Sequence, residues 1–152
     1  MIKLRIQNKY MRKVSDILKR KGNKVSYVSP TVSVVEALEI MAEHNIGSLV
    51  VLERDSFIGI ITERDYSRKI VLMGKSSSDT PVSEIMSTEF PSILPTDTVE
   101  KCMQLMTTKR IRYLPVIENG KLTGIVSMHD VVLETILNQQ ETISHLQSYI
   151  QS

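Results

Sequence analysis

The sequence predicts an α/β (α+β) fold of two β-α-β-β-α repeats that pack about a pseudo-twofold axis, with an extended C-terminal helix. Three observations predict it. The second half of the chain repeats the first, a seven-residue motif occurs once in each half, and an apolar stripe with helical spacing continues beyond the second repeat. A repeat of this size leaves one apolar face open, so the two copies are expected to cover each other.

The repeat is visible when the chain is aligned with itself. Residues 30–67 align with residues 95–132 without a gap. Identical positions include the proline, glycine and aspartate that punctuate each half, namely Pro30/Pro95, Gly59/Gly124 and Asp65/Asp130. We use this alignment as the frame for every element, because a missed repeat would misassign the fold.

Each half is expected to open with a short helical turn. The first turn is predicted at residues 14–18, and the same Val-Ser-Asp/Glu-Ile pattern recurs at residues 82–86. In the first half, residues 25–28 are predicted to form a strand that ends at a Ser29-Pro30 turn.

An amphipathic helix follows in each half. In the first half it is expected from Val34, with Ser33 and Glu36 forming a capping box at its start. In the second half Cys102 takes the place of Ala37 on the buried face, which indicates a small core residue and not a nucleophile. Cys102 is the only cysteine, so no disulfide can form within the chain and nothing indicates an oxidising compartment.

Two hairpins are predicted, one after each amphipathic helix. Their strands are expected at residues 48–52 and 57–61, and at residues 113–117 and 122–126. The connections Arg54-Asp55-Ser56 and Asn119-Gly120-Lys121 are short and rich in turn-forming residues, as hairpins require.

The last predicted helix runs from Asp130 to near the end of the chain. Its stripe outlasts the repeat, so it must be buried on the body of the chain or against another subunit. The stripe contains Val132, Ile136, Gln139, Ile143, Leu146 and Ile150. The resulting domain plan is a basic N-terminal arm (1–12), a first repeat (13–70), a linker (71–81), a second repeat (82–135) and a C-terminal helix extension (136–152).

The seven-residue motif is the strongest functional signal. A hydroxyl and a carboxylate three residues apart at a strand-to-helix junction lie on one face, where the carboxylate can accept hydrogen bonds from a vicinal diol such as that of ribose. The same spacing also forms a helix capping box, and for one isolated copy capping alone would be favoured. Two copies in one frame favour ligand binding: Gly59-Ile60-Ile61-Thr62-Glu63-Arg64-Asp65 and Gly124-Ile125-Val126-Ser127-Met128-His129-Asp130.

Charge is unevenly distributed. Residues 1–25 contain nine Lys or Arg and one acid, whereas the whole chain has a net charge of only +2. The basic residues could contact nucleic acid, an acidic lipid surface or an import receptor, but we expect a solvated, partly flexible arm, and whether residues 1–12 are a targeting segment stays open. The acidic remainder makes nucleic-acid binding improbable. No apolar run is long enough to span a bilayer, so a cytoplasmic protein without membrane partners is expected.

These residues carry a resemblance to a known family. The doubled Val-Ser-Asp/Glu-Ile, the Pro-Thr before each amphipathic helix, the strand Arg112-Tyr113-Leu114-Pro115-Val116 and both Gly-x-x-Thr/Ser-x-x-Asp junctions resemble a tandem cystathionine-β-synthase (CBS) domain pair, or Bateman module. The resemblance covers about residues 12–135. It implies a free-standing regulatory protein that forms a homodimer, binds adenine nucleotides in clefts between the repeats and acts in trans on an unknown partner protein.

The resemblance also assigns site residues. It places Asp65 and Asp130 on ribose hydroxyls, with Thr62 and Ser127 beside ribose or phosphate. It implies AMP as the favoured ligand, with ADP, ATP, NAD or S-adenosylmethionine as possibilities, and no required cofactor. Arg64 and His129 are then cations that could serve phosphate, and the segments expected to line the base and phosphate pocket are Ile46, Gly47 and Ser48 in one half and Arg112, Tyr113 and Leu114 in the other.

An enzyme and a structural module are the two other kinds of function to consider. The three histidines lack the spacing of a metal site, and no nucleophile, base and orienting group coincide, so we expect no metal, no catalytic residues and no enzyme activity. A structural oligomerisation module without a ligand is the alternative to nucleotide binding.

Overall fold

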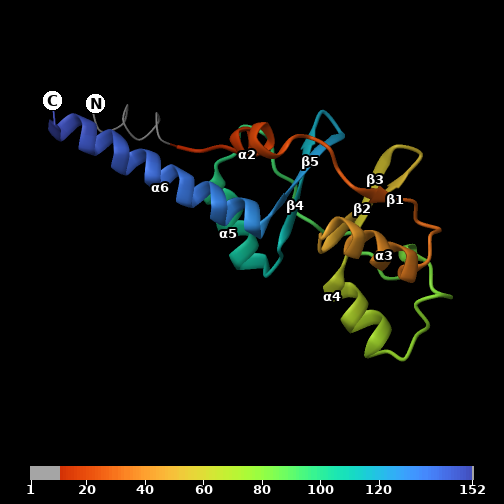
Figure 1. Cartoon of the computed structure of the whole chain (residues 1–152). Coiled ribbons are helices and arrows are strands. Elements are labelled where there is room, and N and C mark those ends of the chain that lie inside the picture. Colours follow the sequence, from red (N-terminus) through yellow and green to blue (C-terminus); the bar gives the residue numbers. More distant parts are fainter. Residues whose placement is uncertain (1–10, 152) are drawn as a thin grey trace. The chain divides into compact units, whose positions relative to one another are not determined.

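The protein is described by a computed structural model that covers residues 11–151 (Figure 1). The chain divides into two compact units. Unit 2 is the continuous stretch from Lys24 to Phe90, and unit 1 combines the residues before it with those from Pro91 onwards. The mixed α+β architecture predicted from the repeat is confirmed.

Unit 2 contains a three-stranded sheet in the order β1-β2-β3. β1 is parallel to β2, and β2 and β3 form an antiparallel hairpin. A short α-helix after β3 continues as the π-helical segment η1, and a 3-10 turn, η2, closes the unit. The elements are β1 (Tyr27–Val28), α3 (Val34–His44), β2 (Ser48–Glu53), β3 (Ser56–Thr62), α4 (Glu63–Tyr66), η1 (Ser67–Val71) and η2 (Val82–Glu84).

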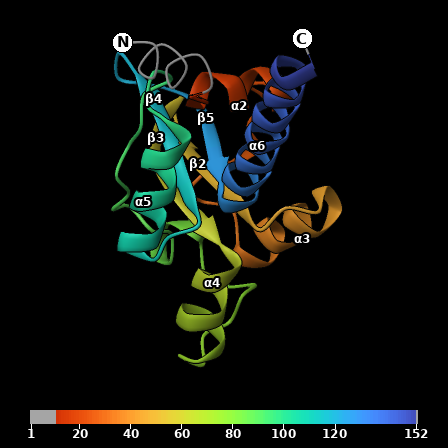
Figure 2. The ribbon, with the colours of Figure 1, turned by 90° about the vertical axis from the view of Figure 1, so that its left-hand side faces the viewer.

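The described part of unit 1 contains the second hairpin and three helices. Figure 2 shows α2 and the long helix α6 side by side. The strand expected before α5 is reduced to one parallel bridge between Ile93 and Val116, because Pro91 and Pro95 flank Ile93 and cannot donate ladder hydrogen bonds. The elements are α2 (Val14–Lys21), α5 (Val99–Lys109), β4 (Tyr113–Glu118), β5 (Lys121–Ser127) and α6 (Met128–Gln151).

Both predicted hairpins are confirmed. The turn after β2 places Arg54 at φ 49° and Asp55 at φ 65°, and the turn after β4 places Asn119 at φ 53° and Gly120 at φ 76°. Two successive residues with positive φ match the twist of a two-residue hairpin, which explains the Asp, Asn and Gly found there.

The amphipathic helices also form as predicted. The hydroxyl of Ser33 accepts the Glu36 N–H, and the Glu36 side chain accepts the Ser33 N–H, which completes the capping box. Cys102 is fully buried in the core of unit 1. Burial raises the pKa of the Cys102 thiol to about 11, which suits the core role expected of it.

Each short turn segment packs against the amphipathic helix of the other repeat. In unit 1, α2 docks beside the start of α5, where the Ser15 N–H donates to the Pro95 carbonyl at 2.9 Å. In unit 2, η2 docks beside the start of α3, where the Ser83 N–H donates to the Pro30 carbonyl at 3.0 Å. Each Val-Ser-Asp/Glu-Ile segment therefore completes the half of the chain that it does not directly precede.

Candidate functional site

In unit 2 the motif forms a helix cap. The Asp65 N–H donates to Thr62 Oγ1 at 3.1 Å, and the Thr62 N–H and hydroxyl each donate to Asp65 Oδ2 at 3.0 Å. Asp65 is only 6% exposed. The capping arrangement that the sequence left as an alternative is therefore present, and it holds the carboxylate in one orientation.

Two further groups bind Asp65. The hydroxyl of Ser87 donates to Asp65 Oδ1 at 2.8 Å, and Lys69 Nζ lies 2.9 Å from the same oxygen. Lys69 Nζ also donates to the Ile85 carbonyl at 2.8 Å. Both carboxylate oxygens of Asp65 are thus engaged within unit 2.

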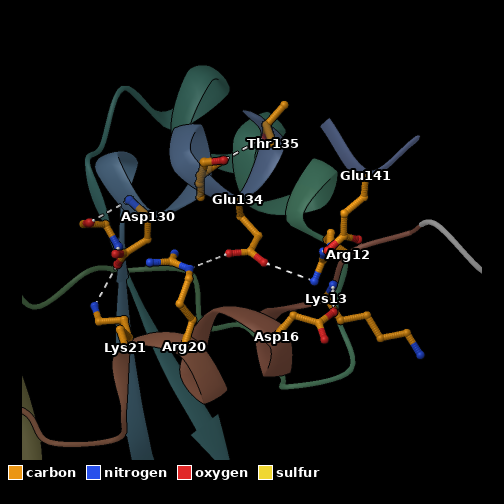
Figure 3. A network of polar contacts seen from close by, with 11 residues as sticks. Arg12, Lys13, Asp16, Arg20, Lys21, Asp130, Glu134, Thr135 and Glu141 are labelled. Carbon is orange, nitrogen blue, oxygen red and sulfur yellow. Dashed lines mark hydrogen bonds and ion pairs between the residues drawn. The ribbon is translucent and has the colours of Figure 1, made fainter. Parts of the chain in front are cut away.

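In unit 1 the second copy of the motif is capped in the same way. The Ser127 N–H donates to Asp130 Oδ2 at 2.8 Å, and the Asp130 N–H donates to Ser127 Oγ at 3.1 Å. Lys21 reaches from α2, placing Nζ 2.7 Å from Asp130 Oδ2 and 2.8 Å from the Ile125 carbonyl oxygen (Figure 3). The Ser127 N–H and Lys21 Nζ therefore both bind the same carboxylate oxygen of Asp130, Oδ2.

The ionisation of Asp130 follows from these contacts. Burial alone would raise its pKa and is the largest single influence, but the hydrogen bonds from Lys21 and Ser127 and the Lys21 charge together outweigh it. The pKa of Asp130 is therefore held below its usual value. A buried, ionised carboxylate is a strong hydrogen-bond acceptor.

Basic residues near the N-terminus surround a second buried acid on α6. Glu134 is 2% exposed, with Oε2 2.9 Å from Arg20 Nε and Oε1 3.7 Å from Arg12 Nη1 (Figure 3). Arg12 also pairs with Glu141. The expectation of a solvated arm is wrong for Arg12, Arg20 and Lys21, because acids on α6 bind all three, while residues 1–10 lie outside the described part of the chain.

The two segments that the sequence assigned to the base and phosphate pocket each lie beside the strand-to-helix motif of the same unit. Ser48 pairs with Thr62 across β2 and β3, and Tyr113 pairs with Ser127 across β4 and β5. The Gly47 carbonyl accepts the Glu63 N–H at 3.2 Å, and the Arg112 carbonyl accepts the Met128 N–H at 2.8 Å. The segments 46–48 and 112–114 are thus brought to the motif within each unit.

The side chains at these positions differ in exposure. Arg112, Arg64 and His129 are exposed, whereas Leu114 is fully buried in the core of unit 1, so its side chain supports β4. Within residues 11–151 the Arg112 guanidinium forms no ion pair. Ile46 packs against the core of unit 2.

Sequence reasoning missed Ser87, Lys69 and Lys21 as partners of the motif aspartates. One signal was available in the repeat frame, where Lys69 of the first repeat stands opposite Glu134 of the second. A charge reversal at equivalent positions indicates that the two helices after the motif have different partners.

These features agree with the comparison to known families. A family model for the CBS domain matches residues 14–72 and again residues 82–135, which is well over half of the chain. The chain belongs to the CBS domain family. The two matches make it a CBS-domain pair, as the resemblance implied.

Relatives support this assignment along most of the chain. The CBS domain-containing protein CBSX3, mitochondrial, of Arabidopsis thaliana is 40% identical over 147 residues, covering 91% of this chain and 71% of the relative. The CBS domain-containing protein YhcV of Bacillus subtilis is 36% identical over 115 residues, covering 76% and 81%. A solved structure from Burkholderia ambifaria, provisionally described as a signal-transduction protein with CBS domains, matches with a TM-score of 0.80 at 42% identity, covering 84% of this chain and 96% of that one.

Among the described residues, no helix combines the length and apolar character needed to cross a bilayer. In the same part of the chain, no group of three or more His, Cys, Asp or Glu side chains is placed to hold a metal ion.

Proposed function

We propose that this CBS pair is a regulatory protein that binds an adenine nucleotide and acts in trans on a partner protein. The observation that carries the proposal is the pair of capped junctions, in which Asp65 and Asp130 are both 6% exposed and oriented by the hydroxyl residue three positions earlier. The provisional description of the Burkholderia protein as a signal-transduction protein supports the regulatory role.

The ribose diol is the part of the ligand that the aspartates would bind. A carboxylate held by a helix-start amide keeps lone pairs for two neighbouring hydroxyls, and hydrogen bonds to a charged acceptor contribute about 1.5–3 kcal/mol. Thr62 and Ser127 then orient the aspartates and border the ribose or phosphate.

A phosphate would be bound by cations near the same junctions. Arg112 is the best candidate, because its exposed guanidinium forms no ion pair in residues 11–151 and its backbone contacts the start of α6. Arg64 and His129 are exposed on the first turn after the motif hydroxyl. AMP is the favoured ligand, with ADP, ATP, NAD and S-adenosylmethionine as the competing adenine compounds, and the base would lie beside segments 46–48 and 112–114.

We also propose that the chain forms a homodimer through α6. Its apolar stripe is exposed within its own chain, with Ile143 55%, Leu146 57% and Ile150 81% exposed. A second copy of the same helix would cover these residues, since soluble proteins rarely leave such a stripe open. Dimerisation without any ligand, as a purely structural module, is the second candidate function and rests on this stripe alone.

Native mass spectrometry tests the ligand directly. The purified protein is mixed with AMP, ADP, ATP, NAD and S-adenosylmethionine one at a time. We expect it to gain the mass of AMP in the sample that contains AMP. AMP at 100 times its dissociation constant should raise the free energy of unfolding by about 2.7 kcal/mol.

The matched variants are Asp65→Asn with Asp130→Asn, and Asp79→Asn as a control. Asn keeps the cap but lacks the charge, so the double variant should fold yet lose the AMP mass shift and the stabilisation. Asp79 is exposed and outside the motif, so its variant should behave as the unchanged protein. Full stabilisation of the double variant by AMP would overturn the ribose assignment. The expected cytoplasmic location stays a prediction, which cell fractionation would test.

A further inference from the structure

The two motif aspartates are engaged by lysines that are not equivalent in the repeat. Lys69 follows Asp65 by four residues, whereas Lys21 comes from α2, far from Asp130 in sequence. In the frame that aligns the two turn segments, Lys21 of the first falls opposite Glu89 of the second. The two halves therefore neutralise their aspartates from different parts of the chain.

Ser87 has no counterpart among the described residues of unit 1. After η2 the chain becomes extended, and Ser87 exchanges two backbone hydrogen bonds of 2.9 Å with Ile60 of β3. This fixes its hydroxyl 2.8 Å from Asp65 Oδ1. In unit 1, α2 instead stays helical to Lys21, and the residue in the place of Ser87 is the exposed Lys19.

The carboxylates of Asp65 and Asp130 consequently differ in how many further hydrogen bonds they can accept. An ionised carboxylate has about four acceptor positions. At Asp65 the two Thr62 donors, Ser87 and Lys69 use both oxygens. At Asp130 the donors Ser127 and Lys21 both bind Oδ2, and Oδ1 receives no hydrogen bond or ion pair from residues 11–151.

We propose that Asp130 is the carboxylate that binds the ribose of the nucleotide, and that Ser87 and Lys69 form a latch that keeps Asp65 closed. The inference rests on the proposed function and refines it by making the two sites unequal. The Ser87 hydroxyl occupies the acceptor position that a ribose hydroxyl needs, so a ligand at Asp65 must displace it.

The latch is supported by the backbone. A Cβ at Gly59 would lie 2.9 Å from the Ser87 carbonyl oxygen, so only glycine lets the Ser87 strand approach β3 so closely. The two backbone hydrogen bonds to Ile60 hold the main chain of Ser87 beside Asp65, so a ligand must turn the Ser87 hydroxyl away from Oδ1 by rotation of its side chain. At Asp130, by contrast, a ligand can bind Oδ1 while Lys21 stays on Oδ2.

Isothermal titration calorimetry with AMP tests the inference on the full chain. The unchanged protein should bind one AMP per chain with high affinity. Asp130→Asn should remove this site, and Asp65→Asn should leave it within about 3-fold. The latch variant Ser87→Ala with Lys69→Met should open the second site and raise the stoichiometry from one towards two.

Neighbouring substitutions provide the matched control. Thr88 and Arg68 are exposed beside the two latch residues, so Thr88→Ala with Arg68→Met should leave one AMP per chain. If the double latch variant unfolds, Ser87→Ala alone should still strengthen binding at the second site. Two equal sites in the unchanged protein, or loss of the strong site in Asp65→Asn, would overturn the inference while leaving the proposed function standing. Absence of AMP binding in every protein would overturn the proposed function itself.

Discussion

Arg20 Nε lies 2.9 Å from Glu134 Oε2, and the Glu134 side chain is 2% exposed. The contact joins α2 to α6 across 114 positions of sequence. Arg12 approaches the other carboxylate oxygen, so two cations neutralise one buried charge. Burying a carboxylate costs several kcal/mol unless it is paired, so the burial of Glu134 depends on these arginines.

The first prediction concerns this pairing. Replacing Arg12 and Arg20 together by Met should lower the free energy of unfolding by about 3 kcal/mol, because Glu134 would stay buried without a partner. Urea unfolding measures the loss. Adding Glu134→Leu should restore most of it, since an apolar side chain needs no partner there.

The exposed pair of Lys101 with Asp97 is the control for this measurement. Lys101 is 51% exposed, so Lys101→Met should cost less than about 1 kcal/mol. Equal costs for the buried and the exposed pairs would contradict the role assigned to Glu134.

The second prediction concerns acid stability. The pKa of Asp130 in the folded protein is below its ordinary 3.8, so the group contributes stability that is present above pH 3.8 and is lost as the pH falls through the folded pKa. Asp130→Asn should therefore make the free energy of unfolding depend less on pH below about pH 4. Urea unfolding between about pH 6 and pH 3 measures this.

Lys21→Met separates the causes of that shift. It removes the strongest of the contacts that lower the pKa of Asp130 while burial persists, so the pKa should rise. Titration of the Asp130 carboxyl by NMR would show it. An unchanged pKa in this variant would mean that the amide and the side chain of Ser127 together account for the shift.

The third prediction compares the two motif glycines. A Cβ at Gly59 would meet the Ser87 backbone oxygen at 2.9 Å, whereas a Cβ at Gly124 would meet the Leu18 side chain at 2.7 Å. Because backbone moves less easily than a side chain, Gly59→Ala should cost about 1–3 kcal/mol and Gly124→Ala less.

Leu18→Val provides the rescue. It shortens the side chain that Gly124→Ala would contact, so the combined variant should be more stable than the sum of the single losses predicts. The same change should not rescue Gly59→Ala. Thermal unfolding of the unchanged protein, the single variants and the two combined variants measures the coupling, and additivity at Gly124 would argue against a steric role for that glycine.

The fourth prediction tests the dimer. Replacing Ile143, Leu146 and Ile150 by Ser should weaken self-association by about 100-fold or more without changing the fold, because these residues are exposed within the chain. Substitution is preferable to truncation after Leu133, which would also remove Glu134 and its ion pairs. Sedimentation velocity at micromolar concentration measures the mass.

Polar residues on the same helix provide the control for dimerisation. Gln140→Ser with Gln147→Ser changes two exposed positions of α6 and should leave the dimer intact. If the unchanged protein is a monomer at micromolar concentration, the proposed dimer is wrong.

The fifth prediction concerns phosphate. Arg112→Ala should weaken AMP binding by about 10- to 100-fold while leaving adenosine binding nearly unchanged, because charge-assisted hydrogen bonds to phosphate would be lost. Calorimetry with both ligands measures the difference. Equal losses for AMP and adenosine would assign Arg112 to the structure of the site and not to phosphate.

Local pattern was enough to predict much of the fold. The Ser33 and Glu36 capping box, both hairpin turns and the burial of Cys102 depend on neighbours close in sequence or on periodicity, which the printed sequence contains. The strand predicted at the start of the second repeat is reduced to a single bridge at Ile93, because Pro91 and Pro95 cannot donate ladder hydrogen bonds.

The hydrogen-bond and ion-pair partners of the two motif aspartates could not be predicted in the same way. The motif spacing identified Asp65 and Asp130, but their partners Ser87 and Lys21 lie 22 and 109 positions away. Such contacts depend on how the turn segments dock, and a repeat frame alone suggests that both halves are alike. Here α2 stays helical while the chain after η2 extends, and this difference decides which group reaches each aspartate.

The discontinuity of unit 1 sets an order for folding during synthesis. Unit 2 is one continuous stretch, so all of it has left the ribosome soon after Phe90 is made. The residues of α2 emerge before unit 2, yet their partners Gly124 and Glu134 are made after it. Because domains fold as units once their residues are available, the inner repeat can fold first, and α2 remains without its partners until α6 has emerged.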